Sequence, residues 1–185
     1  MLRRGFKSEA NQYAREFRLE LGTPPDGPLS PWRLAEHLSI PVYDLSEFAR
    51  IEPQAAFFLS KEGLWEFSGA TFIFARHRLI VINDGHSLKR QASDLGHELS
   101  HCILGHEPAP ERLVSGSRQY DPEQEEEANH LGPTLLISEE AALAIARRGL
   151  SKEQASTEYA VTEHVIQMRL NFTGALKRVR LARAF

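Results

Sequence analysis

The most regular hydrophobic pattern in the chain lies between residues 88 and 104. The apolar residues that form it recur at intervals of four, three, four and three: Leu88, Ala92, Leu95, Leu99 and Cys102. This spacing is typical of a helix with one buried side. Ser87 is suited to cap the start of such a helix, and Gly105 and Pro108 are suited to end it. The pattern therefore predicts one amphipathic helix.

Helical patterns also occur on both sides of this segment. They predict helices over residues 9–21, 32–38, 139–148, 152–158 and 162–172. A further helix is predicted to begin at Asp121, because aspartate is a good N-cap and Pro122 suits the first helical position. Pro133 cannot donate a backbone hydrogen bond to the carbonyl of Asn129, so we expect this helix to kink or break there.

Short runs rich in β-branched and aromatic residues predict strands over residues 40–43, 55–59, 64–67, 71–74 and 79–82. The last two flank residues 75–78 and predict a hairpin, and the segment 106–120 predicts a loop. The sum is an α+β fold, a mostly helical domain with a small, mainly antiparallel sheet. We expect residues 1–150 to form the main domain. Residues 151–185 are expected to form a helical appendage that packs on it or belongs to the same domain.

The composition is that of an ordinary globular protein, with 185 residues, 42% of them hydrophobic and 25% charged. No apolar run follows the basic residues near the N-terminus, so we expect neither a secretory signal nor a membrane span. The single cysteine, Cys102, excludes an internal disulfide and is consistent with a reducing compartment. We therefore expect a cytoplasmic protein. The net charge of −3 disfavours bulk attraction to nucleic acid.

Two histidines on the predicted central helix are spaced for metal binding. His97 and His101 are four residues apart, which places them on nearly the same face of a helix, opposite the apolar stripe. Two imidazoles at this spacing can bind one metal ion, while Glu98 can reach a metal-bound water. The alternative is an ordinary amphipathic helix with two solvent-facing histidines. Cys102 falls on the apolar side, where a buried thiol is expected.

A catalytic zinc ion usually has three protein ligands and one open position. The downstream candidates for the third ligand are two histidines and an acidic run: His106, His130, Glu123, Glu125, Glu126 and Glu127. In the metzincin pattern the third histidine lies six residues after the second, whereas His106 lies five residues after His101. His106 could still turn back toward the metal after the helix ends. Glu125 is favoured because Asn129 shares its helix face and could accept the free ring N–H of a ligand histidine. The alternative is an acidic first turn favoured by the helix macrodipole.

These two segments together resemble a known family. Residues 97–106 read His-Glu-Leu-Ser-His-Cys-Ile-Leu-Gly-His, and residues 125–129 read Glu-Glu-Glu-Ala-Asn. Both look like the ImmA/IrrE family of metallo-endopeptidases, and the likeness extends to residues 31–42, 67–69, 80–83 and 90–91 and to the C-terminal helices. One departure is Leu131-Gly132-Pro133, where the family usually has Phe followed by small helix formers.

The resemblance implies a zincin-like domain with a gluzincin-like HExxH site. His97, His101 and Glu125 would hold zinc, or another divalent metal such as manganese. Glu98 would be the general base toward a metal-activated water. Three side chains are candidates for stabilising the oxyanion: Tyr120, His106 and His130.

Members of this family typically cleave helix-turn-helix repressors encoded beside them, which relieves repression in mobile elements or stress responses. The resemblance therefore implies a protein substrate of this kind. The alternative is a DNA- or protein-binding regulator that retains a metal site but does not cleave, because residues 155–170 have the spacing of a helix-turn-helix. The intact Glu98 counts against that alternative, and Ala160 stands near the place of the usual turn glycine. Peptide deformylase is excluded, because its cysteine ligand lies upstream of HExxH and Cys102 lies downstream.

We expect residues 162–185 to dock the protein substrate rather than to read DNA. Phe172, Leu176 and Val179 are expected to share one helical face. The same segment contains five basic residues: Arg169, Lys177, Arg178, Arg180 and Arg183. Contacts remote from the cleaved bond can orient the substrate segment.

Overall fold

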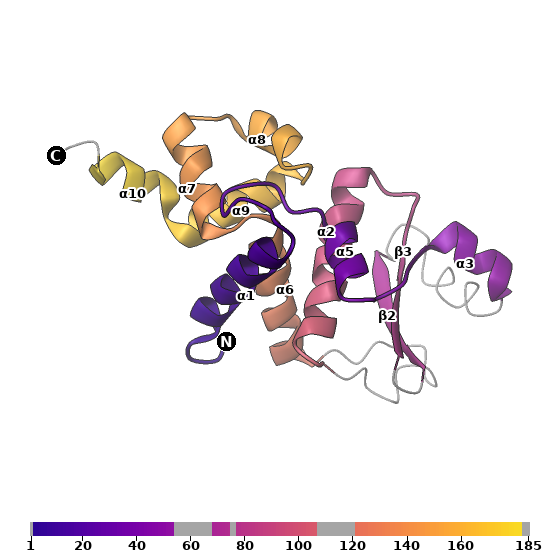
Figure 1. Ribbon diagram of the computed structural model, residues 1–185. Helices are drawn as coiled ribbons and strands as arrows, with labels where there is room; N and C mark the ends of the chain where they lie inside the picture. The colour runs from indigo at the N-terminus through magenta and orange to yellow at the C-terminus, as the bar shows by residue number, and fades with distance from the viewer. Residues whose placement is uncertain (1, 54–67, 75–76, 107–120, 183–185) are drawn as a thin grey trace.

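The computed structural model describes residues 2–53, 68–74, 77–106 and 121–182 (Figure 1). Within these ranges the chain is mostly helical with one small sheet, so the predicted α+β class is confirmed. The helices are α1 (Phe6–Glu20), α2 (Pro31–His37), α3 (Leu45–Ile51), α5 (Leu88–Ile103), α6 (Pro122–Leu136), α7 (Glu139–Arg148), α8 (Lys152–Glu158), α9 (Glu163–Thr173) and α10 (Ala175–Ala182). The strands are β1 (Val42–Asp44), β2 (Gly69–Phe74) and β3 (His77–Ile82).

The three strands form a mixed sheet in the order β1-β3-β2. β2 and β3 pair antiparallel as the predicted hairpin, whereas β1 pairs parallel to β3. The central strand β3 is buried on both faces: Ile80 and Ile82 pack toward the helices, and Val81 packs against Leu45 and Phe48. The strands predicted over residues 55–59 and 64–67 lie outside the described residues.

Helix α5 lies at the centre of the arrangement, between the sheet and α6 (Figure 1). Ala92, Leu95 and Leu99 of its apolar stripe are buried, as the spacing predicted. The predicted burial of Leu88 was wrong, since its side chain is 74% exposed. Leu88 is the first residue of α5 and lies beyond the part of the helix that packs on the core. Leu95 and Leu99 join a cluster that includes Phe6 and Leu34, so α1 and α2 share the core of α5.

Helix α6 continues through Pro133 to Leu136 as one helix, so of the predicted kink or break the break is wrong. The missing backbone donor affects only the carbonyl of Asn129, an exposed residue where water can replace the lost bond. The residues around it keep their hydrogen bonds, since Thr134 Oγ1 donates to the carbonyl of His130 at 2.7 Å. The amide of Ile137 donates to the carbonyl of Pro133 at 2.9 Å.

Two buried arginines hold the C-terminal end of α6. Arg18 of α1 donates from Nη2 to the carbonyl of Leu136 at 3.1 Å, and Arg169 of α9 donates from Nε to that of Ile137 at 2.8 Å. Burial lowers the pKa of both guanidinium groups to about 10, which leaves them charged at neutral pH. Positive charge at this end of a helix complements its macrodipole. α1 and α9 are thereby fixed to α6.

A second hydrophobic cluster joins the end of α6 to helices α7 to α10, and it takes residues from both sides of position 150. α8 and α9 are joined by a short turn in which Ala160 adopts a left-handed conformation with φ 54°. The predicted shared face of the C-terminal segment is wrong. Gly174 ends α9 with φ 61°, so Phe172 belongs to a different helix from Leu176 and Val179. Val179 is buried in the cluster, while Phe172 and Leu176 are exposed.

Two short helices were absent from the sequence prediction. α3 and α10 have seven and eight residues, and neither has the start signals of the equally short α2 and α8, which are a serine cap with proline and a capping box. The predicted docking role of Arg169 is wrong, because its side chain is buried. No helix among the described residues has both the length and the apolar character needed to cross a membrane.

Candidate metal centre

His97 and His101 project from the same side of α5, one turn apart. Their Nε2 atoms are 3.1 Å from each other. Glu125 reaches them from the first turn of α6, with Oε2 at 3.4 Å from His97 Nε2 and Oε1 at 3.6 Å from His101 Nε2. We call these three residues the metal triad. Their potential ligand atoms all lie within 4.8 Å of one another, and no other such group of three occurs among the described residues.

The metal triad fits a tetrahedral divalent metal. Zinc binds imidazole nitrogen and carboxylate oxygen at about 2.0–2.2 Å, which at tetrahedral angles separates neighbouring ligand atoms by about 3.3–3.5 Å. The three observed separations of 3.1, 3.4 and 3.6 Å bracket this value. Two imidazoles and one carboxylate are also the donor types that catalytic zinc sites use, with one coordination position left open. The residues present therefore fit the ion.

The approach of Glu125 to the histidines depends on a close contact between α5 and α6. A Cβ atom added at Gly132 would lie 3.0 Å from the carbonyl carbon and oxygen of Gly96 and 3.0 Å from the amide nitrogen of His97. These distances are tighter than nearly all real Cβ contacts, so any larger residue at position 132 would require the two backbones to move apart by a few tenths of an ångström. The contact lies directly beside the first histidine ligand. The close packing at Gly132 thus brings the backbone of α6 next to that of His97.

The electrostatics of the site favour positive charge between the ligands. Burial opposes the charged form of His97, but the carboxylates of Glu125, Glu98 and Asp94 outweigh it, so the pKa of His97 lies above its usual value. The same carboxylates would attract a metal cation, which would take the place of that proton.

Glu98 is held on the sheet side of α5 by Thr71. The Thr71 hydroxyl donates to Glu98 Oε2 at 2.7 Å. Gly69, two residues earlier on β2, leaves room for the carboxylate, because a Cβ there would lie 3.2 Å from Glu98 Cγ. Cys102 Sγ lies 3.8 Å from the Thr71 hydroxyl, and burial raises the pKa of its thiol. Cys102 is thus a neutral neighbour of Thr71, and it is partly buried, whereas its place in the apolar stripe predicted a buried thiol.

His106 turns back over the end of α5 by a defined backbone motif. The amide of His106 donates to the carbonyl of His101 at 3.0 Å, and the amide of Gly105 donates to that of Cys102 at 3.2 Å. With Gly105 at φ 69°, this is a Schellman motif. The His106 ring meets His101 on its Nδ1 edge, the two Nδ1 atoms being 3.0 Å apart, whereas the metal triad uses Nε2 of His101. His106 therefore lies behind a ligand and outside the triad.

The structure does not bring the remaining candidates to the triad. Asn129 is an exposed residue of α6, and the described contacts include no hydrogen bond from it to either histidine. His130 is buried on the opposite side of α6, with its ring centre 5.8 Å from that of Phe6 and 4.4 Å from that of Phe172. Burial, together with the charges of Arg169 and Lys7, lowers the pKa of His130 to about 4. Tyr120 lies outside the described residues.

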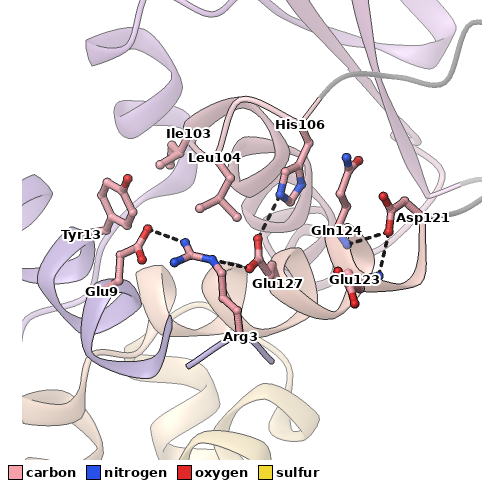
Figure 2. Close-up of a pocket in the computed structure, with 10 residues that line it drawn as sticks. All are labelled: Arg3, Glu9, Tyr13, Ile103, Leu104, His106, Asp121, Glu123, Gln124 and Glu127. Carbon is pink, nitrogen blue, oxygen red and sulfur yellow. Dashed lines mark hydrogen bonds and ion pairs between the residues drawn. The ribbon is translucent and has the colours of Figure 1, made fainter. Parts of the chain in front are cut away.

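A pocket of about 430 Å³ opens behind His106, between α1 and the adjoining ends of α5 and α6 (Figure 2). Its lining residues are Arg3, Glu9, Tyr13, Ile103, Leu104, His106, Asp121, Glu123, Gln124 and Glu127. Figure 2 shows Arg3 extended between Glu9 and Glu127, with Glu127 pointing toward His106. The sequence analysis named Glu127 only as a candidate third ligand, and it missed Arg3, Thr71 and the contact at Gly132. Each depends on packing between segments far apart in the chain.

The model of the IrrE N-terminal-like domain, in the M78 peptidase family, matches residues 57–171. The matched segment contains α5, α6 and β2, and so the metal triad and Glu98. No curated protein and no solved structure matches the chain.

Gly132→Ala should push α5 and α6 apart. We expect a loss of about 1–3 kcal/mol of stability from overpacking, and metal affinity roughly tenfold weaker because ligand geometry tolerates only about 0.5 Å of displacement. The comparison variant is Gly96→Ala, whose Cβ would meet the flexible end of Leu136 at 3.2 Å. Both substitutions raise helix propensity equally. A difference in metal affinity between the two variants therefore reports the clash with backbone that only Gly132→Ala introduces. Equal metal affinities in chelator competition would show that the contact does not set the site.

His130→Phe should flatten the acid dependence of stability. The pKa of His130 is lowered to about 4 in the folded protein, against about 6.5 when unfolded. The unfolded chain therefore takes up the proton first as the pH falls, and stability is lost between about pH 6.5 and 4. Through His130, the free energy of unfolding of the parent protein should fall by about 2 kcal/mol between pH 7 and pH 5. Urea unfolding of both proteins at these two pH values measures it; an equal loss in the variant would assign the acid sensitivity elsewhere.

Proposed function

The chain belongs to the family of IrrE N-terminal-like peptidase domains, and we propose that it is a zinc-dependent endopeptidase. In this proposal His97, His101 and Glu125 hold the metal and Glu98 is the general base. Manganese or another divalent ion is the alternative to zinc. The observation that supports the proposal best is the meeting of Glu125 with the two histidines. These side chains come from separate helices, and their ligand atoms lie at the spacing of a tetrahedral site.

The position of Glu98 supports its role in proton transfer. When bound, the metal ion would lower the pKa of a coordinated water toward about 7 and polarise the scissile carbonyl. Glu98 directly follows the ligand His97, and its carboxylate would accept a proton from the attacking water and deliver it to the leaving amine. The hydrogen bond from Thr71, at 2.7 Å, would hold the Glu98 carboxylate in one orientation during both transfers.

We further propose that the substrate is a helix-turn-helix repressor, whose cleavage would relieve repression in a mobile element or a stress response. This part rests on the family resemblance, and such a substrate would place the reaction in the cytoplasm. Tyr120 remains our candidate for stabilising the oxyanion, since the structure holds His106 behind His101 and His130 away from the triad. Direct binding of DNA is disfavoured by the surface of α9. Its exposed first residue, Glu163, would face phosphate with a negative charge.

A non-cleaving regulator that keeps its metal site is the competing proposal. α8 and α9 have the arrangement of two short helices joined by a tight turn, which favours it. Against it stand the intact Glu98 and the threonine that orients it, because a regulator without peptidase activity has no use for a positioned base. The two proposals differ in whether cleavage depends on Glu98.

Glu125→Ala should lose the metal, because it leaves two imidazoles to hold the ion. Glu123→Ala is the matched control, since Glu123 is an exposed carboxylate in the same first turn of α6. We expect one equivalent of zinc per chain in the parent and the control, and less than about a tenth of an equivalent in Glu125→Ala after dialysis. Full zinc content in Glu125→Ala would remove it from the ligand set.

Glu98→Gln should keep the fold and the metal but abolish cleavage, because the amide is nearly isosteric yet cannot accept the proton. The protein is co-expressed with a helix-turn-helix repressor encoded next to it, and truncation of the repressor is followed by immunoblot. We expect a shortened product with the parent and none with Glu98→Gln. An intact repressor with both proteins would favour the non-cleaving regulator, and cleavage by zinc-loaded Glu98→Gln would remove Glu98 from the mechanism.

A further inference from the structure

The hydrogen bonds behind His101 determine which of its ring nitrogens carries the proton. If Nε2 of His101 binds the metal, as the proposed function requires, the proton of the neutral ring must be on Nδ1. That N–H faces Nδ1 of His106, which lies 3.0 Å away and can accept from it. His106 must then accept at Nδ1 and carry its own proton on Nε2. This nitrogen lies 3.3 Å from Glu127 Oε2, so it donates to a carboxylate (Figure 2).

Glu127 is fixed in turn by the N-terminal segment. Arg3 donates from Nε to Glu127 Oε1 at 2.7 Å, using the carboxylate oxygen that His106 does not use. Arg3 also donates from Nη2 to Glu9 Oε1 at 2.7 Å. Its Cζ atom lies 4.9 Å from the centre of the Phe6 ring. Phe6 is fully buried in the core shared with α5 and α6. The position of Arg3 is therefore tied to the packing of α1.

We propose that His106, Glu127 and Arg3 are positioning residues of the metal centre, which hold His101 with Nε2 toward the metal. His101 thus donates to His106, His106 donates to Glu127, and Arg3 donates to Glu127 from the other side. Arg3 lies outside residues 57–171, so the N-terminal segment completes a site that the family-matched segment does not complete alone. The proposal rests on the metal triad of the proposed function and adds what orients one of its members.

The backbone of His106 is also fixed, which makes the ring a defined partner. Arg78 of β3 donates from Nη1 to the carbonyl of His106 at 3.0 Å, and the Schellman motif fixes its amide. His106 and Glu127 are both largely buried, with side-chain exposures of 9% and 15%. A hydrogen bond in this environment is less exposed to competition from water than one at the surface. Residues that support a metal-binding histidine in this way typically contribute about 10–100-fold to metal affinity.

The first test separates the hydrogen bond from the packing of the His106 ring. His106→Leu removes the acceptor for His101, whereas His106→Asn places an amide oxygen near the position of Nδ1. By chelator competition with Zn²⁺, we expect affinity to fall about 10–100-fold in His106→Leu and to recover to within about fivefold of the parent in His106→Asn. The control is His37→Leu, which removes a histidine paired with Glu20 at 2.7 Å on the surface, away from the site. It should bind Zn²⁺ as the parent does.

The second test addresses the N-terminal residue. Arg3→Gln should weaken Zn²⁺ binding about threefold to tenfold, because Glu127 loses its ionic partner. Arg15→Gln is the matched control: Arg15 lies in α1, is 55% exposed against 50% for Arg3, and also places Nε at 2.7 Å from a carboxylate, that of Glu140. It should leave affinity unchanged. In the His106→Leu background, Arg3→Gln should have no further effect, since the path to His101 is already cut.

The absorption spectrum of the Co²⁺-substituted protein reports ligand geometry directly and does not depend on activity. We expect altered visible bands in His106→Leu and Arg3→Gln, and the parent spectrum in His37→Leu and Arg15→Gln. Parent-like affinity and spectrum in a folded His106→Leu protein would overturn the proposal. So would equal losses in Arg3→Gln and Arg15→Gln, which would indicate a general effect on α1. If the parent binds no metal, the proposed function fails first, and this result is distinguishable from all of these.

Discussion

The contact of α5 with α6 at Gly132 is the constraint on which the candidate site depends. α5 presents two histidines by helical geometry alone, but a third ligand has to come from another element. Backbone-to-backbone packing beside His97 brings α6 close enough for Glu125 to reach both imidazoles. The opposite end of α6 is fixed by Arg18 and Arg169. The site is thus set by the crossing of two helices and by the anchoring of one of them.

The same arrangement links the site to parts of the chain distant in sequence. Thr71 on β2 orients Glu98 on one side of α5, and His106 contacts His101 on the other. The N-terminal segment contributes Arg3, and α9 contributes Arg169, which holds α6. Preorganisation of this kind matters for a metal centre because its ligands must stand close together before the ion binds. In this molecule several elements each restrain one residue of the metal triad or a neighbour of it.

The sequence predicted what repeats at a regular interval or carries a local signature. Examples are the apolar stripe of α5, the capped start of α6 and the hairpin of β2 and β3. The first two placed four site residues on the helices where the structure has them: His97, Glu98, His101 and Glu125. What the sequence did not predict depends on tertiary contact. Asn129 has the right spacing to support a histidine but faces solvent, while His106 takes that position through a Schellman motif. Pro133 removes only the hydrogen bond to the carbonyl of Asn129, an exposed residue, and the buried residues on both sides of Pro133 keep the helix intact.

The most direct test of this account is anomalous X-ray diffraction at the zinc edge from crystals of the zinc-loaded protein. The account predicts one strong peak per chain between α5 and α6, with Nε2 of His97, Nε2 of His101 and the carboxylate of Glu125 at about 2.0–2.2 Å. His106 should lie outside the coordination shell, with its Nδ1 in contact with Nδ1 of His101. A peak coordinated by His106, or one from which Glu125 is missing, would contradict the account.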